Sequence, residues 1–180
     1  MGNIPLDKTH KSKDIDIAVN YDTLQSLRTK YKLQKNERMH KYEIKQDIFD
    51  IDIYLPFYSK LAIPLEDLEQ LSTKIEGIRV PKTEVLLLLK QAAEIDRRNT
   101  IKGKKDSIDI MTLMLRTSVD IKKYLLLTKK YGLEQYPKEL LYAIEKFSEQ
   151  DIDYLGIDYV QFKKEKTFAN DKNSGEVKIE

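Results

Sequence analysis

The sequence predicts an α+β protein in which a small mixed β-sheet is followed by a C-terminal helical bundle. Two observations support this fold class. Up to about residue 80, short segments that alternate acidic and apolar residues are interrupted by Gly and Pro, which is typical of strands and turns. After Pro81, long stretches contain neither Gly nor Pro, which is typical of helices. A hydrophobic share of 41% is enough to form a core.

The first part is expected to open with a polar loop at residues 1–13. Asp14–Val19 then alternates acidic with apolar residues and is expected to be a strand, and residues 48–55 form the clearest alternating segment of the chain. Pro56 and Pro64 bracket a loop between two further predicted elements. The complete prediction for this part is strands at 14–19, 38–46, 48–55 and 75–80, the last with a bulge at Gly77, and helices at 21–31 and 65–71.

The second part is expected to be helical. Gly132 is typical of a helix end, and Pro137 is typical of a first helical position. The predicted helices are 82–98, 104–116, 119–131 and 137–147. We therefore expect a strand-rich core at residues 1–80, a helical subdomain at 81–162 and a flexible tail at 163–180.

Several classes of protein are excluded or disfavoured by composition. The chain has no Cys, which excludes a disulfide scaffold, thiol catalysis and thiolate metal sites. Its longest apolar run is Val85–Leu89, far short of the roughly 18 residues of a membrane span. Residues 1–16 lack the apolar segment of a signal peptide, so we expect a cytoplasmic protein with no membrane partner. A net charge of +2 does not by itself indicate nucleic-acid binding.

Two predicted strands carry the same acidic tripeptide, Asp14-Ile15-Asp16 and Asp50-Ile51-Asp52. Residues two apart in a strand share a face, so pairing the two strands would gather four carboxylates. Like charges opposite one another destabilise a sheet. Mg²⁺, which prefers oxygen ligands, would relieve this repulsion, and two such ions are the basis of much phosphoryl-transfer chemistry. The alternative is a solvated acidic face with no ligand. A third copy, Asp151-Ile152-Asp153, lacks a strand pattern and is expected at a helix start or in a loop.

A second charged group lies in the helical part. Lys90, Glu94 and Arg97 share one helix face, and five basic residues with no acid lie between Arg97 and Lys105. Gly103 is expected to let this segment bend as a loop, before Asp106 and Asp109 share a face of the next helix. The segment predicts either a clamp for a polyphosphate or structural ion pairs between these bases and acids.

Four stretches together resemble the nucleotidyltransferase superfamily with the polymerase-β-like fold, nearest the AbiEii-like toxins of toxin–antitoxin systems. Their order and spacing match the family over about residues 2–118. The stretches are Thr9–Val19 (THKSKDIDIAV), Phe49–Tyr54 (FDIDIY), Glu84–Ala93 (EVLLLLKQAA), and Asp96-Arg97-Arg98 followed by Lys105–Ile110 (KDSIDI).

The resemblance implies transfer of a nucleoside monophosphate from an NTP to a hydroxyl of RNA, such as tRNA, or of a protein. It implies two Mg²⁺ ions held by Asp14, Asp16 and Asp52, the last also helping to activate the acceptor, with Asp50 in a supporting role. An antitoxin is the implied partner. The residues implied to bind or organise the nucleotide are Gly2, Asn3, Ser12, Lys90, Arg97, Lys105 and Asp106.

The resemblance is incomplete at the front of the chain. Gly2-Asn3 stands where the family has Gly-Ser or Gly-Gly, and the helix and strand that usually support this element would lie before Met1. We therefore expect an N-terminally shortened domain whose exposed sheet edge favours homo-oligomers. This departure keeps two alternatives open: a non-catalytic binding or assembly module, and a two-metal nuclease or phosphodiesterase.

Overall fold

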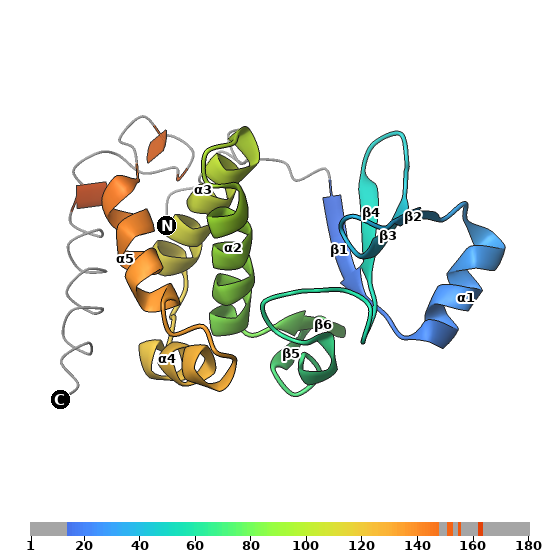
Figure 1. Cartoon of the computed structure of the whole chain (residues 1–180), viewed down its shortest axis with the longest axis horizontal. Coiled ribbons are helices and arrows are strands. Elements are labelled where there is room, and N and C mark those ends of the chain that lie inside the picture. Colours follow the sequence, from blue (N-terminus) through green and yellow to red (C-terminus); the bar gives the residue numbers. More distant parts are fainter. Residues whose placement is uncertain (1–13, 148–150, 153–154, 156–161, 164–180) are drawn as a thin grey trace. The chain divides into compact units, whose positions relative to one another are not determined.

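The computed structural model describes residues 14–147 together with residues 151, 152, 155, 162 and 163. Within these residues it has five α-helices and two sheets of four and two strands, which confirms the predicted α+β class (Figure 1). The chain divides into two compact units, one within Lys11–Ser72 and one that contains the chain from Thr73 onward. Among the predicted features, Gly2, Asn3, Ser12 and nearly all of the tail lie outside the described residues.

The first unit contains a four-stranded mixed sheet in the order β1-β4-β3-β2. Strand β1 (Asp14–Ala18) runs parallel to β4 (Asp50–Tyr54). Strand β3 (Lys41–Ile44) is antiparallel both to β4 and to β2 (Gln34–Asn36). The predicted strands at 14–19 and 48–55 are therefore confirmed, with slightly shorter bounds.

The hairpin between β2 and β3 differs from the sequence prediction. Strand β2 was not predicted, and the strand predicted to start at Arg38 starts at Lys41. The intervening turn includes His40, whose positive φ of 50° is incompatible with a strand, and the Asn36 side chain accepts a hydrogen bond from the Met39 backbone. The local side-chain hydrogen bond thus ends β2 and delays the start of β3.

One face of this sheet packs against helix α1 (Tyr21–Lys30), whose first turn is capped by the side chain of Asn20. Ile15 lies on the core side of β1 by alternation but is 47% exposed, because β1 is the edge strand of the described sheet. The core of this unit consists of Leu24, Ile44, Ile53 and Leu55, with Ile17, Val19, Leu27, Leu33, Tyr42, Ile51 and Tyr58 packed around them.

Two further predictions in this region need correction. The helix predicted at 65–71 is only the short 3-10 turn η2 (Leu65–Asp67). The strand predicted at 75–80 is instead a hairpin of β5 (Ser72–Ile75) and β6 (Ile78–Pro81). Glu76 and Gly77 both have positive φ, so they form the tight turn of a hairpin rather than a bulge.

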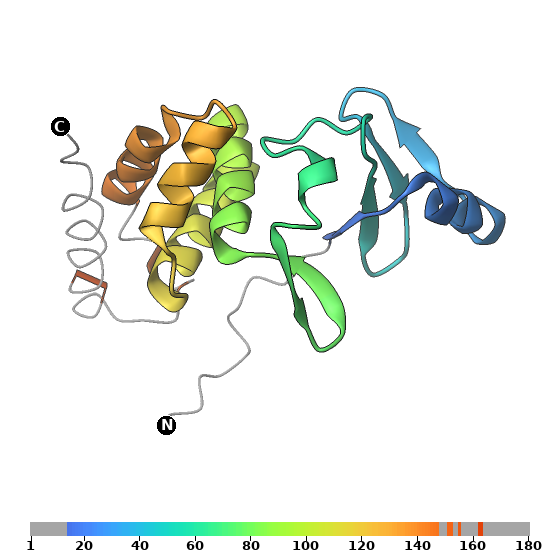
Figure 2. The ribbon, with the colours of Figure 1, turned by 90° about the horizontal axis from the view of Figure 1, so that it is seen from below.

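Over its described residues the second unit contains four α-helices, and the predicted helices agree with them to within a few residues. They are α2 (Thr83–Arg97), α3 (Ile101–Arg116), α4 (Ile121–Lys130) and α5 (Tyr136–Lys146). Helix α2 contacts the other three, and Figure 2 shows the four packed as a bundle. No helix among the described residues is both long enough and apolar enough to cross a membrane.

A buried amide joins three helices of this bundle. Gln91 on α2 accepts a 2.8 Å hydrogen bond from the Tyr124 hydroxyl on α4 and donates a 3.0 Å bond to the Tyr136 carbonyl oxygen on α5. Burial raises the pKa of Tyr124, although the hydrogen bond to Gln91 lowers it in part. The neutral phenol is therefore the form that the folded bundle stabilises.

We expect the stability of this bundle to fall as the pH rises above about 10, the ordinary pKa of tyrosine. Above that pH the unfolded chain releases the Tyr124 proton while the folded chain keeps it, so the free energy of unfolding decreases. Urea unfolding of the wild type and of Tyr124→Phe at pH 8 and at about pH 11 measures the effect. The wild type should lose more stability between the two pH values than Tyr124→Phe does. Equal losses in the two proteins would show that ionisation of Tyr124 is not the cause.

Candidate functional site

The face of the four-stranded sheet that lies opposite its apolar core carries the predicted acidic residues. In the parallel register of β1 and β4, Asp14 lies opposite Asp50 and Asp16 lies opposite Asp52. Because residues alternate between faces, all four carboxylates belong to the face opposite the core. The pairing of the two acidic strands, predicted from the repeated tripeptide, is therefore confirmed.

Strand β3 adds three charged residues to the same face. Its antiparallel register places Glu43 opposite Asp52, so Lys41, Glu43 and Lys45 share the side of the carboxylates. We refer to these seven residues as the acidic sheet face: Asp14, Asp16, Lys41, Glu43, Lys45, Asp50 and Asp52. With two ammonium groups against five carboxylates, this face has a net charge of −3.

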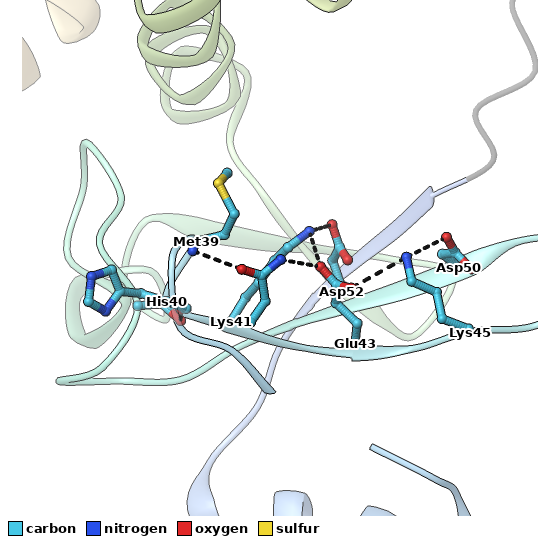
Figure 3. Close-up of polar contacts among 9 residues, drawn as sticks. Met39, His40, Lys41, Glu43, Lys45, Asp50 and Asp52 are labelled. Carbon is cyan, nitrogen blue, oxygen red and sulfur yellow. Dashed lines mark hydrogen bonds and ion pairs between the residues drawn. The ribbon is translucent and has the colours of Figure 1, made fainter. Parts of the chain in front are cut away.

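Lys41 is the most enclosed cation of the acidic sheet face. Its ammonium group binds the Asp52 carboxylate and lies 3.2 Å from Glu43 Oε1, as Figure 3 shows. The three side chains are only 12–13% exposed. Burial lowers the pKa of Lys41, but hydrogen bonds to Asp52 and Glu43 outweigh it, and the net shift is upward. The ammonium form of Lys41 is thus held firmly by these two carboxylates.

Lys45 makes the corresponding contacts two residues further along β3. Its Nζ lies 2.7 Å from Asp50 Oδ2 and 3.4 Å from Glu43 Oε2, while its side chain remains 48% exposed (Figure 3). The hydrogen bond from Lys45 lowers the pKa of Asp50. A hydrogen bond from the side chain of Asn36, with those from the two lysines, lowers the pKa of Glu43. Alternating charges thus connect β3 with β4.

The acids of β1 have a different environment. Asp14 and Asp16 are both exposed. Among the residues that the structure describes, the Asp16 carboxylate has no hydrogen-bond or ion-pair partner. Its carboxylate lies one strand away from Asp52, which already has a cation. Asp16 is therefore the acid of this face that is most available to an added ligand.

The predicted Mg²⁺ ligands fit a cation site in their chemistry and register. Asp14, Asp16 and Asp52 offer only oxygen donors from neighbouring strands, and the Lys41 ammonium group shows that Asp52 accepts a positive charge at this position. No group of three potential ligands converges among residues 14–147 or the few described residues beyond them. The side chain of Asp52 turns toward Lys41 on β3, so it would have to turn toward β1 to join Asp14 and Asp16.

In the helical unit, the structure joins the predicted phosphate-binding bases to acids. Lys90 Nζ lies 2.6 Å from Asp109 Oδ2. The Arg97 guanidinium group makes a two-bond contact with Asp106, at 2.6 and 2.9 Å, and Asp106 is buried. These contacts are structural ion pairs, which the sequence analysis gave as the alternative to a polyphosphate clamp. Lys105 is exposed and has no such partner among the described residues.

The predicted bend at Gly103 is wrong. Helix α3 begins at Ile101, three residues before the predicted start at Lys104, so Gly103 lies within the helix. The Thr100 hydroxyl accepts a 3.1 Å hydrogen bond from the Gly103 backbone, which caps this helix and starts it earlier than its polar sequence suggested. Gly103 is a point of close backbone approach to Arg97 and not a bend.

Sequence reasoning missed two sets of residues. Lys41, Glu43 and Lys45 could have been found from their alternation along a predicted strand that pairs with the acidic strands. Arg98 binds Glu94 in a two-bond contact at 2.8 and 2.9 Å and Glu139 at 2.6 Å. The four-residue spacing of Glu94 and Arg98 was the available signal for this second contact. Asp151, the first residue of the third acidic tripeptide, also forms a structural ion pair, since it is buried 2.9 Å from Lys104 Nζ.

No protein-family model matches the chain, and no curated protein or solved structure is detectably similar to it.

Proposed function

We propose that the chain is a Mg²⁺-dependent nucleotidyltransferase of the polymerase-β-like type. It transfers a nucleoside monophosphate from an NTP to a hydroxyl of RNA, such as tRNA, or of a protein, and acts in the cytoplasm as the toxin of a toxin–antitoxin pair. The observation that supports this proposal best is the parallel register that sets Asp14 and Asp16 against Asp50 and Asp52. Lys41 and Lys45 compensate Asp52 and Asp50, whereas the exposed carboxylate of Asp16 has no cation among the described residues, so a bound Mg²⁺ would relieve the remaining repulsion between the two strands.

In this proposal Asp14, Asp16 and Asp52 hold Mg²⁺, which supplies charge compensation for the phosphates of the NTP. Asp16 contributes an exposed carboxylate. Asp52 is nearly enclosed, and its proposed second role, which the resemblance implies, is to help activate the acceptor hydroxyl. Within the helical unit, the contact between Arg97 and Asp106 keeps the Arg97 guanidinium group in a fixed position.

Titration of each of the four NTPs into the protein, with and without Mg²⁺, tests the proposal. The wild type should bind at least one NTP only when Mg²⁺ is present, and Asp16→Ala should lose this binding by at least about tenfold in affinity, because it removes a charged ligand. Asp47→Ala is the matched control, since Asp47 is an exposed acid in the turn before β4 and outside the acidic sheet face. Equal heats from the wild type and Asp16→Ala would contradict the proposal.

A second candidate function is a non-catalytic binding or assembly module. The observation that favours it is the internal neutralisation of β4, where Lys41 and Lys45 bind Asp52 and Asp50 without a metal. This candidate predicts no Mg²⁺-dependent NTP binding and a stable oligomer in light scattering.

The remaining alternative is a two-metal nuclease or phosphodiesterase. Incubation with radiolabelled NTP and RNA distinguishes it from a transferase, because a nuclease would cleave the RNA without NTP whereas a transferase would label the RNA.

A further inference from the structure

We infer that Lys41 is an intramolecular competitor of the divalent cation, so that Mg²⁺ gains Asp52 as a ligand only when the Lys41 ammonium group leaves it. The inference rests on the proposed function and concerns the regulation of that same site. It assigns to Lys41 a role in setting the metal concentration at which the site becomes occupied.

The argument begins with the position of the ammonium group. Lys41 Nζ contacts both Asp52 and Glu43, and all three side chains are largely enclosed. A metal ion and an ammonium group that share one carboxylate repel each other strongly in such an enclosed place, where water screens the charges poorly. The two cations therefore compete for Asp52.

Lys41 is also well placed to leave. It is the first residue of β3, directly after the turn that ends at His40, and its long side chain has several rotatable bonds. Glu43, at 3.2 Å, can keep the ammonium group when Asp52 turns away, because its carboxylate is already oriented by a 2.8 Å hydrogen bond from Asn36. The exchange thus requires a side-chain rotation and no change in the sheet.

Lys45 provides an internal comparison. It directly follows β3, binds a β4 acid and also approaches Glu43. Its partner, however, is Asp50, which is not one of the three predicted ligands, and its side chain is half exposed. Removal of either lysine changes the net charge equally, but only removal of Lys41 releases Asp52.

The experiment is calorimetric titration of Mn²⁺, as a probe for Mg²⁺, into the wild type, Lys41→Met and Lys45→Met, in the absence of nucleotide and at physiological ionic strength. Lys41→Met should bind Mn²⁺ about tenfold more tightly than the wild type, because no charged hydrogen bond has to be broken. Lys45→Met should differ from the wild type by less than about twofold, because screening weakens the effect of an exposed charge. Circular dichroism establishes that each variant is folded, and Lys41→Gln replaces Lys41→Met if the latter is not.

Each other outcome contradicts the inference. An equal gain in both variants would show that net charge alone sets the affinity. Unchanged or weaker binding in Lys41→Met would show that Lys41 supports Asp52 as a ligand or has no influence on it. Both outcomes leave the proposed function standing, since the wild type still binds the metal. Absence of Mn²⁺ binding in every variant would overturn the inference and the proposed metal site together.

Discussion

Replacement of Gly103 by Ala is expected to lower the free energy of unfolding of the helical unit by about 3 kcal/mol, the upper part of the range for overpacked sites. The direction is opposite to that of intrinsic helix propensity, which favours Ala over Gly by about 1 kcal/mol inside a helix. Gly103 lies in the first turn of α3 and is buried. The expected loss therefore depends entirely on what surrounds the Cα atom of Gly103.

The obstacle is the end of helix α2. A Cβ atom at position 103 would lie 2.1 Å from the Arg97 carbonyl oxygen and 2.9 Å from the Arg98 Cα atom. Both are backbone atoms, so no rotation of a side chain relieves the contact. The same carbonyl oxygen accepts hydrogen bonds from the Thr100 backbone and hydroxyl groups, at 2.9 and 2.8 Å, and these would have to shift as well. The turn that joins α2 to α3 thus requires glycine.

Chemical unfolding of Gly103→Ala and of the control Gly132→Ala measures this effect. Gly132 follows α4 with a φ of +67°, and nothing lies within 4 Å of its added Cβ atom. The control should lose only the cost of a left-handed backbone, about 1 kcal/mol. A gain in stability for Gly103→Ala, or losses of the same size in both variants, would contradict the close approach.

The acidic sheet face could be predicted in part because strand periodicity assigns each residue to a face. The repeated tripeptide was sufficient to place Asp14 and Asp16 on the same face as Asp50 and Asp52, once the two strands were paired. Alternation alone did not identify the neighbours across the sheet. Strand β2 has only three residues, which carry no periodic signal, so the β2–β3 hairpin was missed, and with it the role of Lys41 and Lys45 beside the acidic strands.

The errors at Gly103 and at the turn formed by Glu76 and Gly77 have a different physical origin. Gly103 was interpreted as flexible because sequence shows which conformations a glycine permits, but not which atoms approach it. The turn at Glu76 and Gly77 was likewise misjudged, since Glu rarely adopts a positive φ and gives no sign of it locally. Thr is a residue type that often caps helices, but the polar residues after Thr100 do not have the apolar periodicity that would have indicated a helix start at Ile101.

The second large effect is expected at the contact between Lys41 and Asp52. Lys41→Met and Asp52→Leu should each lower the free energy of unfolding by about 2–3 kcal/mol, because each leaves a largely enclosed charge without its main partner. The double variant, which replaces both charged side chains with apolar ones, should lose less than the sum of the two by about 2 kcal/mol. Urea unfolding of the four proteins gives this coupling energy directly. Strictly additive losses would show that the pair contributes no more than an exposed ion pair.

This coupling decides how variants of the acidic sheet face can be interpreted. If Asp52 stabilises the sheet through Lys41, loss of NTP binding in an Asp52 variant reports on folding as well as on the metal site. Asp16 is exposed and has no partner among the described residues, so its removal costs the sheet little and relieves the repulsion from Asp52. Asp16→Ala should therefore be as stable as the wild type or slightly more stable, and a loss of Mg²⁺-dependent binding in that variant can be attributed to the ligand itself.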